Sequence, residues 1–336
     1  MTDIQSTIDV EFAAPMLCKT TDRTELDAAK WAGYVAEPKH DGVRCLAIAH
    51  EDGTVKLYSR TGNEFTEHVP HLITELEGYM PAGSVLDGEL AILHGHIDIG
   101  RRRVPVTDFG STMRVLGSLP ERGRKVQDEL GKTMTFILYD MLMWDGVRYH
   151  DEYQRDRRKM LKEGFPFGSS NLFLNPIFTD PSRFGELFDT LITHGIEGII
   201  IKNTEAGYLF EGRPNKTWYK VKAAVTLDMI VSGYTDGAGK YEGLIGTVEF
   251  SRMDEVGNLV YVGRCSGMTD DLRREITANK DKYMGAVIEV KANELVGSKE
   301  YRSPRHPQFV AFRFDKNPED CTGEELKPIP KTGAAK

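Results

Sequence analysis

The chain has 336 residues, of which 40% are hydrophobic and 28% are charged, and its net charge is −8. This length and composition are typical of a soluble protein of two domains. The sequence has no run of roughly 18 apolar residues, so we expect no membrane-spanning helix. Residues 1–12 lack the features of a secretory signal and the four cysteines form no CxxC pair. We therefore expect a cytoplasmic protein (in the host cytoplasm, if viral) with neither a disulfide framework nor a zinc site.

The first two thirds of the chain alternate helical and strand patterns, which favours the α+β class. An amphipathic helix is predicted at residues 24–32, followed by strand, tight turn at Gly42 and strand over residues 34–50. Residues 84–93 are predicted to form a strand pair with a turn at Asp87-Gly88. Residues 55–65 are expected to form a strand that runs into a loop. Further strands are expected at residues 134–146, 196–203 and 216–224, and further helices at residues 71–80, 151–164 and 182–195.

Basic residues gather in residues 101–125, where seven Arg or Lys accompany Asp108 and Glu121. We expect a solvated loop here. A basic segment in a chain whose acidic residues lie elsewhere can hold a polyanion on one face, because binding responds to the local field rather than to the net charge.

The pattern changes near residue 224. From residue 225 onward short strands dominate, interrupted by one helix at residues 269–283. About five strands, one helix and glycine-rich turns over roughly 100 residues predict a small Greek-key barrel such as the OB-fold. The expected organisation is a first domain at residues 1–224, an OB-fold domain at residues 225–325 and a disordered tail at residues 326–336.

Short charged groups recur at the ends of the predicted strands, beginning with KHDGVR at residues 39–44. The others are SRTG at 59–62, LDGEL at 86–90, LYDML at 138–142, EGIIIK at 197–202, WYKVK at 218–222 and FRFDK at 312–316. Because side chains alternate along a strand, Lys220 and Lys222 share one face, as do Arg313 and Asp315.

These seven motifs in this order, with a β-rich domain after the sixth, resemble the covalent nucleotidyltransferases and, among them, the ATP-dependent DNA ligases, over residues 37–316. The resemblance implies a nucleotidyltransferase (adenylation) domain of mixed antiparallel sheets with flanking helices, followed by an OB-fold β-barrel domain. It also implies a reaction in three steps, in which a lysine takes AMP from ATP, AMP passes to the 5′-phosphate of a nick, and the 3′-OH displaces AMP. The layout is similar to that of small bacteriophage-type ligases, which serve DNA replication, repair and recombination.

The resemblance assigns the nucleophile to Lys39, whose amine must be uncharged to attack the α-phosphate. An ordinary lysine has a pKa near about 10.4, so we expect Lys220, Lys222 and bound Mg²⁺ to lower the pKa of Lys39. Lys220 and Lys222 are also expected to contact the α-phosphate and to stabilise charge in the transition state. Lys216 is a weaker candidate for a phosphate contact.

The remaining site residues follow from the same resemblance. Mg²⁺ (or Mn²⁺) prefers oxygen ligands, for which Glu197 and Glu89 are the candidates, with a ribose contact open as the alternative for Glu89. Tyr139 is expected to stack on the adenine. Glu37 is expected to contact the adenine and Arg44 the ribose. Arg60 is expected to contact the nucleotide and the DNA 5′-phosphate, and Arg313 and Lys316 are expected to contact the β and γ phosphates.

Nicked duplex DNA is the expected partner, and the protein is expected to act as a monomer away from membranes. Arg60, Arg101, Arg102 and Arg103 are the expected DNA contacts, which makes the affinity strongly dependent on salt. The family implies a hinge near residues 222–227 that closes the domains for lysine adenylation and opens them to clamp DNA.

Other functions fit the sequence less well. A capping enzyme would transfer GMP, but the final RxDK motif of this chain resembles the ligase form. Many RNA ligases carry a C-terminal domain that differs from the barrel expected here. NAD-dependent ligases need an additional N-terminal module and zinc-binding cysteines, which are missing from this sequence. A single-strand-binding module would leave the first 224 residues unexplained. A P-loop is excluded because the GKT at residues 131–133 has Val126 where the first glycine belongs.

Overall fold

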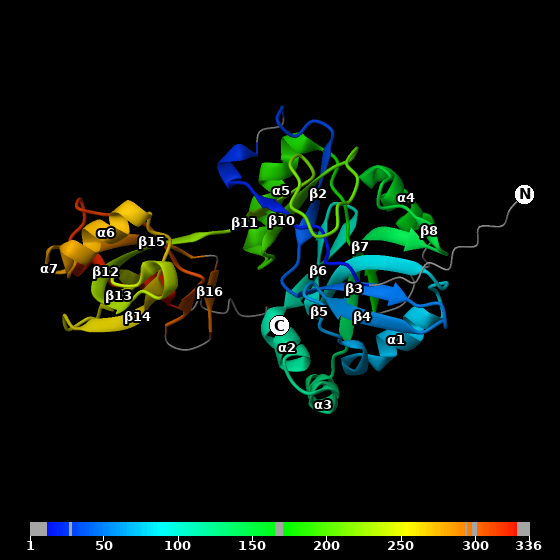
Figure 1. Cartoon of the computed structure of the whole chain (residues 1–336), viewed down its shortest axis with the longest axis horizontal. Coiled ribbons are helices and arrows are strands. Elements are labelled where there is room, and N and C mark those ends of the chain that lie inside the picture. The colour runs from blue at the N-terminus through cyan, green and yellow to red at the C-terminus, as the bar shows by residue number, and fades with distance from the viewer. Residues whose placement is uncertain (1–11, 27–28, 165–170, 293, 298–300, 328–336) are drawn as a thin grey trace, which may run out of the picture. The chain divides into compact units, whose positions relative to one another are not determined.

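The computed structural model describes residues 12–26, 29–164, 171–292, 294–297 and 301–327. It consists of two compact units, Met1–Lys222 and Ala223–Lys336 (Figure 1). Within the described ranges, every helix falls short of the length and apolar character that crossing a membrane demands. The tail predicted at residues 326–336 lies outside the described residues from residue 328 onward.

A four-stranded sheet in the first unit has the order β1-β11-β10-β2. Its strands are β1 (Lys19–Thr20), β2 (Tyr34–Lys39), β10 (Gly198–Asn203) and β11 (Trp218–Lys222). Helix α5 (Phe184–Thr193) contacts β10 and buries four apolar side chains at helical spacing, Phe184, Leu187, Phe188 and Leu191. The predicted strands in EGIIIK and WYKVK are therefore confirmed, and they are direct neighbours.

A seven-stranded sheet forms the other part of the first unit, with the path β4-β3-β5-β7-β8, β6 beside β5 and β9 beside β7. The strands are β3 (Val43–Ala49), β4 (Val55–Ser59), β5 (Ser84–Ile99), β6 (Arg102–Asp108), β7 (Met134–Trp144), β8 (Val147–Arg148) and β9 (Leu172–Leu174). Its helices are α1 (Pro70–Glu77), α2 (Phe109–Leu116), α3 (Pro120–Leu130) and α4 (Gln154–Gly164). Helices α1, α2 and α4 contact the strands and cover an apolar core that includes Leu57, Leu72 and Phe136.

The KHDGVR motif carries the chain from one sheet to the other. The predicted strand, turn and strand over residues 34–50 are confirmed, but β2 pairs with β10 whereas β3 pairs with β4 and β5. The crossing brings Gly42 so close to β5 that a Cβ there would lie 2.6 Å from the carbonyl oxygen of Leu90. Glycine is thus needed at residue 42 for the close approach of two backbones.

Two of the predicted elements are wrong. The helix expected at residues 24–32 is a short 3-10 helix, Arg23–Glu25, followed by turns, with residues 27–28 outside the described ranges. The turn expected at Asp87-Gly88 is absent, because β5 runs through both residues as one long strand. Gly88 instead allows β7 to approach: a Cβ there would meet the carbonyl oxygen of Ile137 at 2.6 Å.

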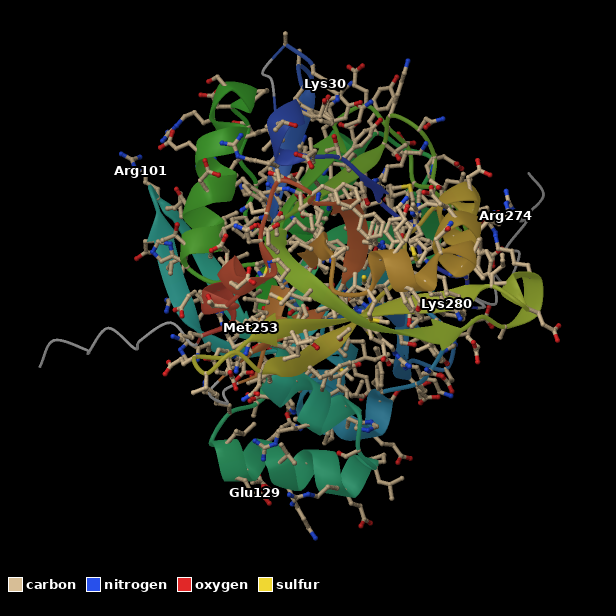
Figure 2. The ribbon with its side chains drawn as sticks, turned by 90° about the vertical axis from the view of Figure 1, so that its left-hand side faces the viewer. Lys30, Arg101, Glu129, Met253, Arg274 and Lys280 are labelled. Atoms are coloured by element: carbon tan, nitrogen blue, oxygen red, sulfur yellow. The ribbon has the colours of Figure 1, made fainter. Side chains whose placement is uncertain are left out.

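The basic segment at residues 101–125 is mostly regular structure rather than the expected loop. It contains β6, α2 and the first half of α3. Asp108 accepts a hydrogen bond from the backbone nitrogen of Ser111 at 2.9 Å and caps α2, and Pro120 occupies the first turn of α3. Arg101 lies at the turn between β5 and β6 and projects from it (Figure 2).

The second unit is a five-stranded antiparallel sheet with the order β14-β13-β12-β15-β18. Its elements are β12 (Val225–Asp236), β13 (Ile245–Met253), β14 (Leu259–Cys265), β15 (Val287–Ala292) and β18 (Gln308–Phe312), with α6 (Asp270–Ala278), α7 (Lys280–Tyr283) and a separate pair β16 (Glu294–Val296) and β17 (Ser303–Arg305). Both units mix helices with antiparallel sheets, so the predicted α+β class is confirmed. Among the described residues the ladder does not close into a barrel; a single bridge between Ser266 and Gln308 joins its edges.

Candidate active site

Lys39 is the last residue of β2 and stands in one row with two residues of the neighbouring strands. It pairs in register with Gly198 of β10, which pairs in turn with Lys222 of β11. Gly198 has φ of 153°, and a Cβ there would lie 2.0 Å from the carbonyl oxygen of Val221. The glycine therefore allows β11 to approach β10 next to Lys39, at a spacing that a side chain would prevent.

Two lysines share the carboxylate of Glu197. The Nζ of Lys39 donates to Oε2 of Glu197, and the Nζ of Lys222 forms an ion pair with Oε1. The three side chains are 16 to 24% exposed, so these charges are partly desolvated. Glu197 directly precedes β10, which places its carboxylate between the ends of β2 and β11.

The pKa of Lys39 is raised rather than lowered. Burial lowers it, but the carboxylates of Glu197 and Glu89 raise it by more. The predicted lowering of the Lys39 pKa is therefore wrong for these contacts, because the two carboxylates outweigh burial. The pKa of Lys220, by contrast, is lowered by burial and by the charges of Lys222 and Lys39.

Glu89 lies opposite Arg44 in the pairing of β5 with β3. Burial raises the pKa of Glu89 to about 8 against the opposing influence of Lys39 and Arg44, and the like charge of Glu197 raises it further. A partly buried carboxyl with a raised pKa, beside a second carboxylate, suits a divalent cation with waters and phosphates as its other ligands. Groups of three or more metal-ligating side chains are absent from the described residues.

Arg44 forms a bidentate pair with the fully buried Asp87. Its Nε and Nη2 lie 3.1 and 2.6 Å from Oδ1 and Oδ2 of Asp87. Nη1 donates to the carbonyl of Met16 at 2.5 Å, and the hydroxyl of Tyr208 donates to Asp87 Oδ2 at 2.8 Å. This anchoring fixes the direction of the Arg44 side chain, so Asp87 holds in place a residue for which the sequence predicted a ribose contact.

A second buried ion pair joins Glu37 to Lys202. Their Oε1 and Nζ atoms lie 2.9 Å apart, and both side chains are 1% exposed. The ammonium of Lys202 lies 4.6 Å from the ring centroid of Tyr139 and 4.1 Å from that of Trp218. Tyr139 and Glu37, both predicted to contact adenine, therefore meet around one lysine to which the sequence assigned no role.

Asn175 and His40 also lie next to Lys39, and sequence reasoning missed both. Asn175 Oδ1 is 2.8 Å from Nε2 of His40, and its Nδ2 is 3.1 Å from Oε2 of Glu37. Burial and the charge of Lys39 lower the pKa of His40 to about 4. A histidine directly after Lys39 was visible in the sequence, but Asn175 stands far away in an NP dipeptide that is typical of a turn.

The predicted DNA contacts differ in their surroundings. Arg60 is exposed in the turn that follows β4. Arg103 contacts Nδ1 of His96 at 3.4 Å, from the strand paired to β5. Arg102 turns toward the protein: its Nε donates to the carbonyl of Ile177 at 2.5 Å, and its guanidinium lies 5.0 Å from the ring centroid of Phe178.

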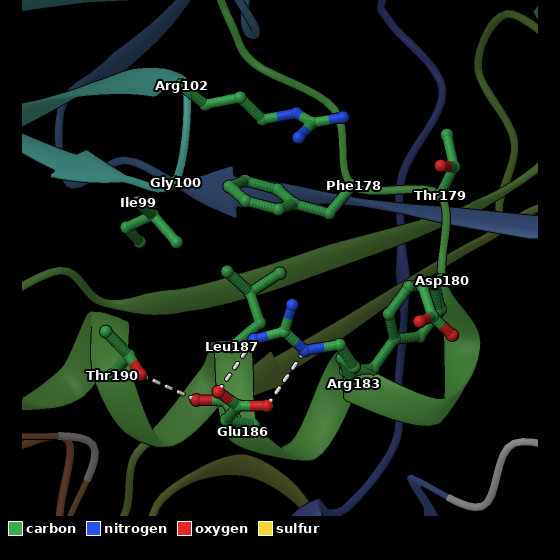
Figure 3. Close-up of a pocket in the computed structure, with 11 residues that line it drawn as sticks. Ile99, Gly100, Arg102, Phe178, Thr179, Asp180, Arg183, Glu186, Leu187 and Thr190 are labelled. Carbon is green, nitrogen blue, oxygen red and sulfur yellow. Dashed lines mark hydrogen bonds and ion pairs between the residues drawn. The ribbon is translucent and has the colours of Figure 1, made fainter.

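Arg102 and Phe178 form one wall of a pocket of about 230 Å³ (Figure 3). The opposite side is the start of α5, where Arg183 and Glu186 form a bidentate pair. Arg183 and Glu186 in this pocket are thus paired with each other, and Arg102 stacks on Phe178. Arg102 contributes to the packing of the first unit as well as to its surface charge.

In the second unit, Arg313 and Lys316 are held by acidic residues of their own sheet. The Nη1 of Arg313 lies 3.2 Å from Glu289 and 3.4 Å from Asp228, and Nζ of Lys316 lies 2.8 Å from the other oxygen of Asp228. Asp315 completes the group with a bidentate pair to Arg313. The two cations of the FRFDK motif thus gather around Asp228, which the sequence did not single out.

Comparisons with known proteins agree with this geometry. The family model of the ATP dependent DNA ligase domain matches residues 15–222. A "Probable DNA ligase" of Saccharopolyspora erythraea is 28% identical over 312 residues, covering 89% of this chain and 57% of that protein. A "DNA ligase" of Methanococcus maripaludis is 28% identical over 350 residues, covering 94% of this chain and 59% of that protein. The chain thus spans less than two thirds of the curated relatives it matches.

Solved structures share the fold. "Pmar-Lig_PreS3" has a TM-score of 0.69 at 22% identity, covering 90% of this chain and 68% of that one. A structure from a study of Lig E DNA ligases has a TM-score of 0.63 at 21% identity, covering 90% of this chain and all of that one. Because the family model covers more than half of the residues, including the row of Lys39, Gly198 and Lys222, the chain belongs to the family of the ATP-dependent DNA ligase domain.

Proposed function

We propose that this chain is an ATP-dependent DNA ligase that seals 3′-OH/5′-phosphate nicks through lysyl-AMP on Lys39 and a DNA-adenylate. The observation that carries the proposal is the cluster that Lys39, Lys222 and Glu197 form at the ends of three adjacent strands. A triphosphate bound at this cluster would meet a nucleophilic amine and two further lysines, Lys220 and Lys222. Lys220 and Lys222 are the residues proposed to neutralise the α-phosphate.

Attack requires that Lys39 lose its proton, and Glu197 is the group that retains it. Once the carboxylates of Glu197 and Glu89 are both engaged elsewhere, burial and the charges of Lys220 and Lys222 remain around Lys39, and both disfavour a positive charge. Glu197 and Glu89 are the residues proposed to hold Mg²⁺ or Mn²⁺, which when bound stabilises negative charge on the phosphates. Glu197 is thus proposed to keep Lys39 protonated until the donor arrives.

The choice of ATP over GTP is proposed to rest on the Glu37–Lys202 pair. Adenine presents an amino donor beside the N1 acceptor, whereas guanine presents the O6 acceptor beside an N1–H donor. The Glu37 carboxylate is an acceptor and the Lys202 ammonium, 2.9 Å away, is a donor. This pair is proposed to match the amino group and N1 of adenine and to oppose O6 and N1–H of guanine. Tyr139, whose ring packs edge-on to Trp218, is proposed to stack on the base. Arg44 is proposed to contact the ribose.

Nicked duplex DNA is the proposed partner of the first unit, with Arg60, Arg101, Arg102 and Arg103 as contacts to the backbone. Affinity from such contacts falls steeply with added salt. The anchoring of Arg102 supports a rigid basic hairpin, because its guanidinium is fixed against Ile177 and Phe178. Arg101 and Arg103 are the residues whose replacement tests DNA contact with the least disturbance of packing.

The finer assignments complete the proposal. The adenylation domain is proposed to span residues 1–224 and the OB-fold domain residues 225–325, with Arg313 and Lys316 orienting the β and γ phosphates when the hinge closes. The protein is proposed to act as a cytoplasmic monomer in DNA replication, repair and recombination, in the manner of the small bacteriophage-type ligases.

The decisive experiment is incubation with α-labelled ATP and, separately, α-labelled GTP in the presence of Mg²⁺, followed by denaturing electrophoresis. We expect label on the protein from ATP alone, and we expect nicked duplex to discharge it. The Lys39→Arg variant keeps the charge but removes the nucleophile, and it should carry no label. Label on that variant, or label from GTP in preference to ATP, would contradict the proposal.

A further inference from the structure

The amide of Asn175 reaches both sides of the nucleophile. Its Nδ2 lies 3.1 Å from Oε2 of Glu37 and 3.2 Å from the carbonyl oxygen of Pro38, while its Oδ1 lies 2.8 Å from Nε2 of His40. One side chain therefore contacts the residues two before, one before and one after Lys39. Asn175 is itself 2% exposed, so these hydrogen bonds form away from water.

The backbone of Asn175 is fixed by elements of the other sheet. Its nitrogen donates to the carbonyl of Leu138 in β7 at 2.9 Å, and its carbonyl accepts from Nη2 of Arg158 in α4. The residue follows β9 directly, and β9 pairs in parallel with β7. Asn175 thus connects the seven-stranded sheet to the strand that carries Lys39 in the four-stranded sheet.

The orientation of this amide follows from its partners. Glu37 Oε2 and the Pro38 carbonyl are both acceptors, so the group that faces them must be the NH₂ with its two donors. The Oδ1 atom then faces His40, whose Nε2 must carry the proton. All three hydrogen bonds are satisfied in one arrangement only, which leaves the Glu37 carboxylate held by Asn175 on one oxygen and by Lys202 on the other.

We propose that Asn175 is a positioning residue that sets donor selectivity by holding the Glu37 carboxylate at the angle from which it reads the purine, while clamping the backbone beside Lys39. This inference rests on the proposed function. Without the amide, the carboxylate can turn toward Lys202 with both oxygens, since the second oxygen has lost its donor. The effect on the base is indirect, because Asn175 acts through Glu37.

The test compares Asn175→Ala with a matched control, Gln127→Ala. Gln127 is also a buried amide of the first unit that spans two segments: its Nε2 donates to the carbonyl of His68 at 3.0 Å and its Oε1 accepts from the nitrogen of Met134 at 2.9 Å. Lysine labelling is measured as a function of nucleotide concentration, with ATP and with purine ribonucleoside triphosphate, which lacks the 6-amino group.

Asn175→Ala should raise the half-saturating concentration of ATP between about tenfold and a hundredfold, as expected for a lost hydrogen bond to a charged group. The half-saturating concentration of the purine analogue should change much less, so the preference for ATP collapses. Gln127→Ala should leave that preference unchanged. Equal loss of labelling with both nucleotides, or equal behaviour of the two variants, would overturn the inference, whereas an unlabelled wild-type protein would overturn the proposed function instead.

A second pair of variants keeps the test decisive if Asn175→Ala does not fold. Asn175→Asp places a carboxylate against Glu37 and should lower the thermal midpoint. Adding Glu37→Gln lets the new amide at residue 37 donate to the new carboxylate at residue 175, which reverses the direction of the original hydrogen bond. The double variant should therefore be more stable than Asn175→Asp alone. Additive losses of stability in this cycle would show that the two side chains are not coupled, and the inference would fall.

Discussion

The two units hold their charges in different ways. In the first unit the Lys202–Glu37 pair is 1% exposed on both sides, and burial is the largest influence on Glu89, whose pKa rises to about 8. In the second unit, Asp315 is 66% exposed, and its hydrogen bonds to Arg313 lower its pKa to about 2. Desolvation therefore dominates the first group and direct pairing the second. Buried pairs fix side chains in place, whereas exposed pairs can exchange partners at little cost.

The largest effect is expected from breaking the buried pair. Lys202→Met keeps most of the length of the side chain but leaves the Glu37 carboxylate buried without its ammonium partner, which should cost about 3–5 kcal/mol of the free energy of unfolding. Urea denaturation measures this loss. Adding Glu37→Gln should recover part of it, because a neutral amide replaces the unpaired charge. A loss below about 1 kcal/mol for Lys202→Met would mean that this pair does not behave as a buried one.

An intermediate effect is expected from Glu89, as a dependence of stability on pH. The folded pKa of about 8 lies above the ordinary value of 4.5, so the folded chain binds more protons than the unfolded chain between these values. Stability should therefore fall as pH rises through this window, by at most about 1.4 kcal/mol per pH unit from this group, with no contribution below the window.

Glu89→Gln removes the titrating proton and should flatten this dependence. The measurement is the free energy of unfolding of wild type and variant at pH 5 and at pH 8. The variant should gain stability relative to wild type at the higher pH. An equal difference between the two proteins at both values would contradict the raised pKa.

The smallest effect is expected in the second unit. Asp228→Asn weakens the contacts to Arg313 and Lys316, but Arg313 retains Glu289 and Asp315 as partners, and the side chain of Lys316 is 39% exposed to water. The thermal midpoint should shift by no more than about 3 °C. Scanning calorimetry of both proteins gives the shift. A fall as large as that caused by Lys202→Met would erase the contrast between the two units.

Many strands of the fold could be predicted because the spacing of apolar residues along the sequence indicates which side chains are buried. The alternating WYKVK and the apolar run before Tyr139 were predicted as strands, and both are. The turn at Asp87-Gly88 was wrong because a glycine can mark the close approach of a neighbouring strand as well as a bend. The helix at residues 24–32 was wrong because amphipathic spacing over so short a stretch does not determine a helix.

The site was predictable where its residues stand in contiguous motifs. Lys39, Glu197 and Lys222 come from three such motifs, and the structure brings them together. Asn175 was missed because its function depends on contacts that form only when two sheets meet. Lys202 was visible within EGIIIK, but its ion pair with Glu37 spans strands far apart in the sequence, and no local pattern reports such a pair.

The absence of a side chain at Gly198 constrains how this protein can change over evolutionary time. Even a methyl group there would collide with the Val221 carbonyl, so any replacement must push β11 away from β10. The same displacement would separate Lys222 from Glu197. The close packing of the two strands at Gly198 and the contact of Lys222 with Glu197 are therefore linked, so that one substitution would disturb both.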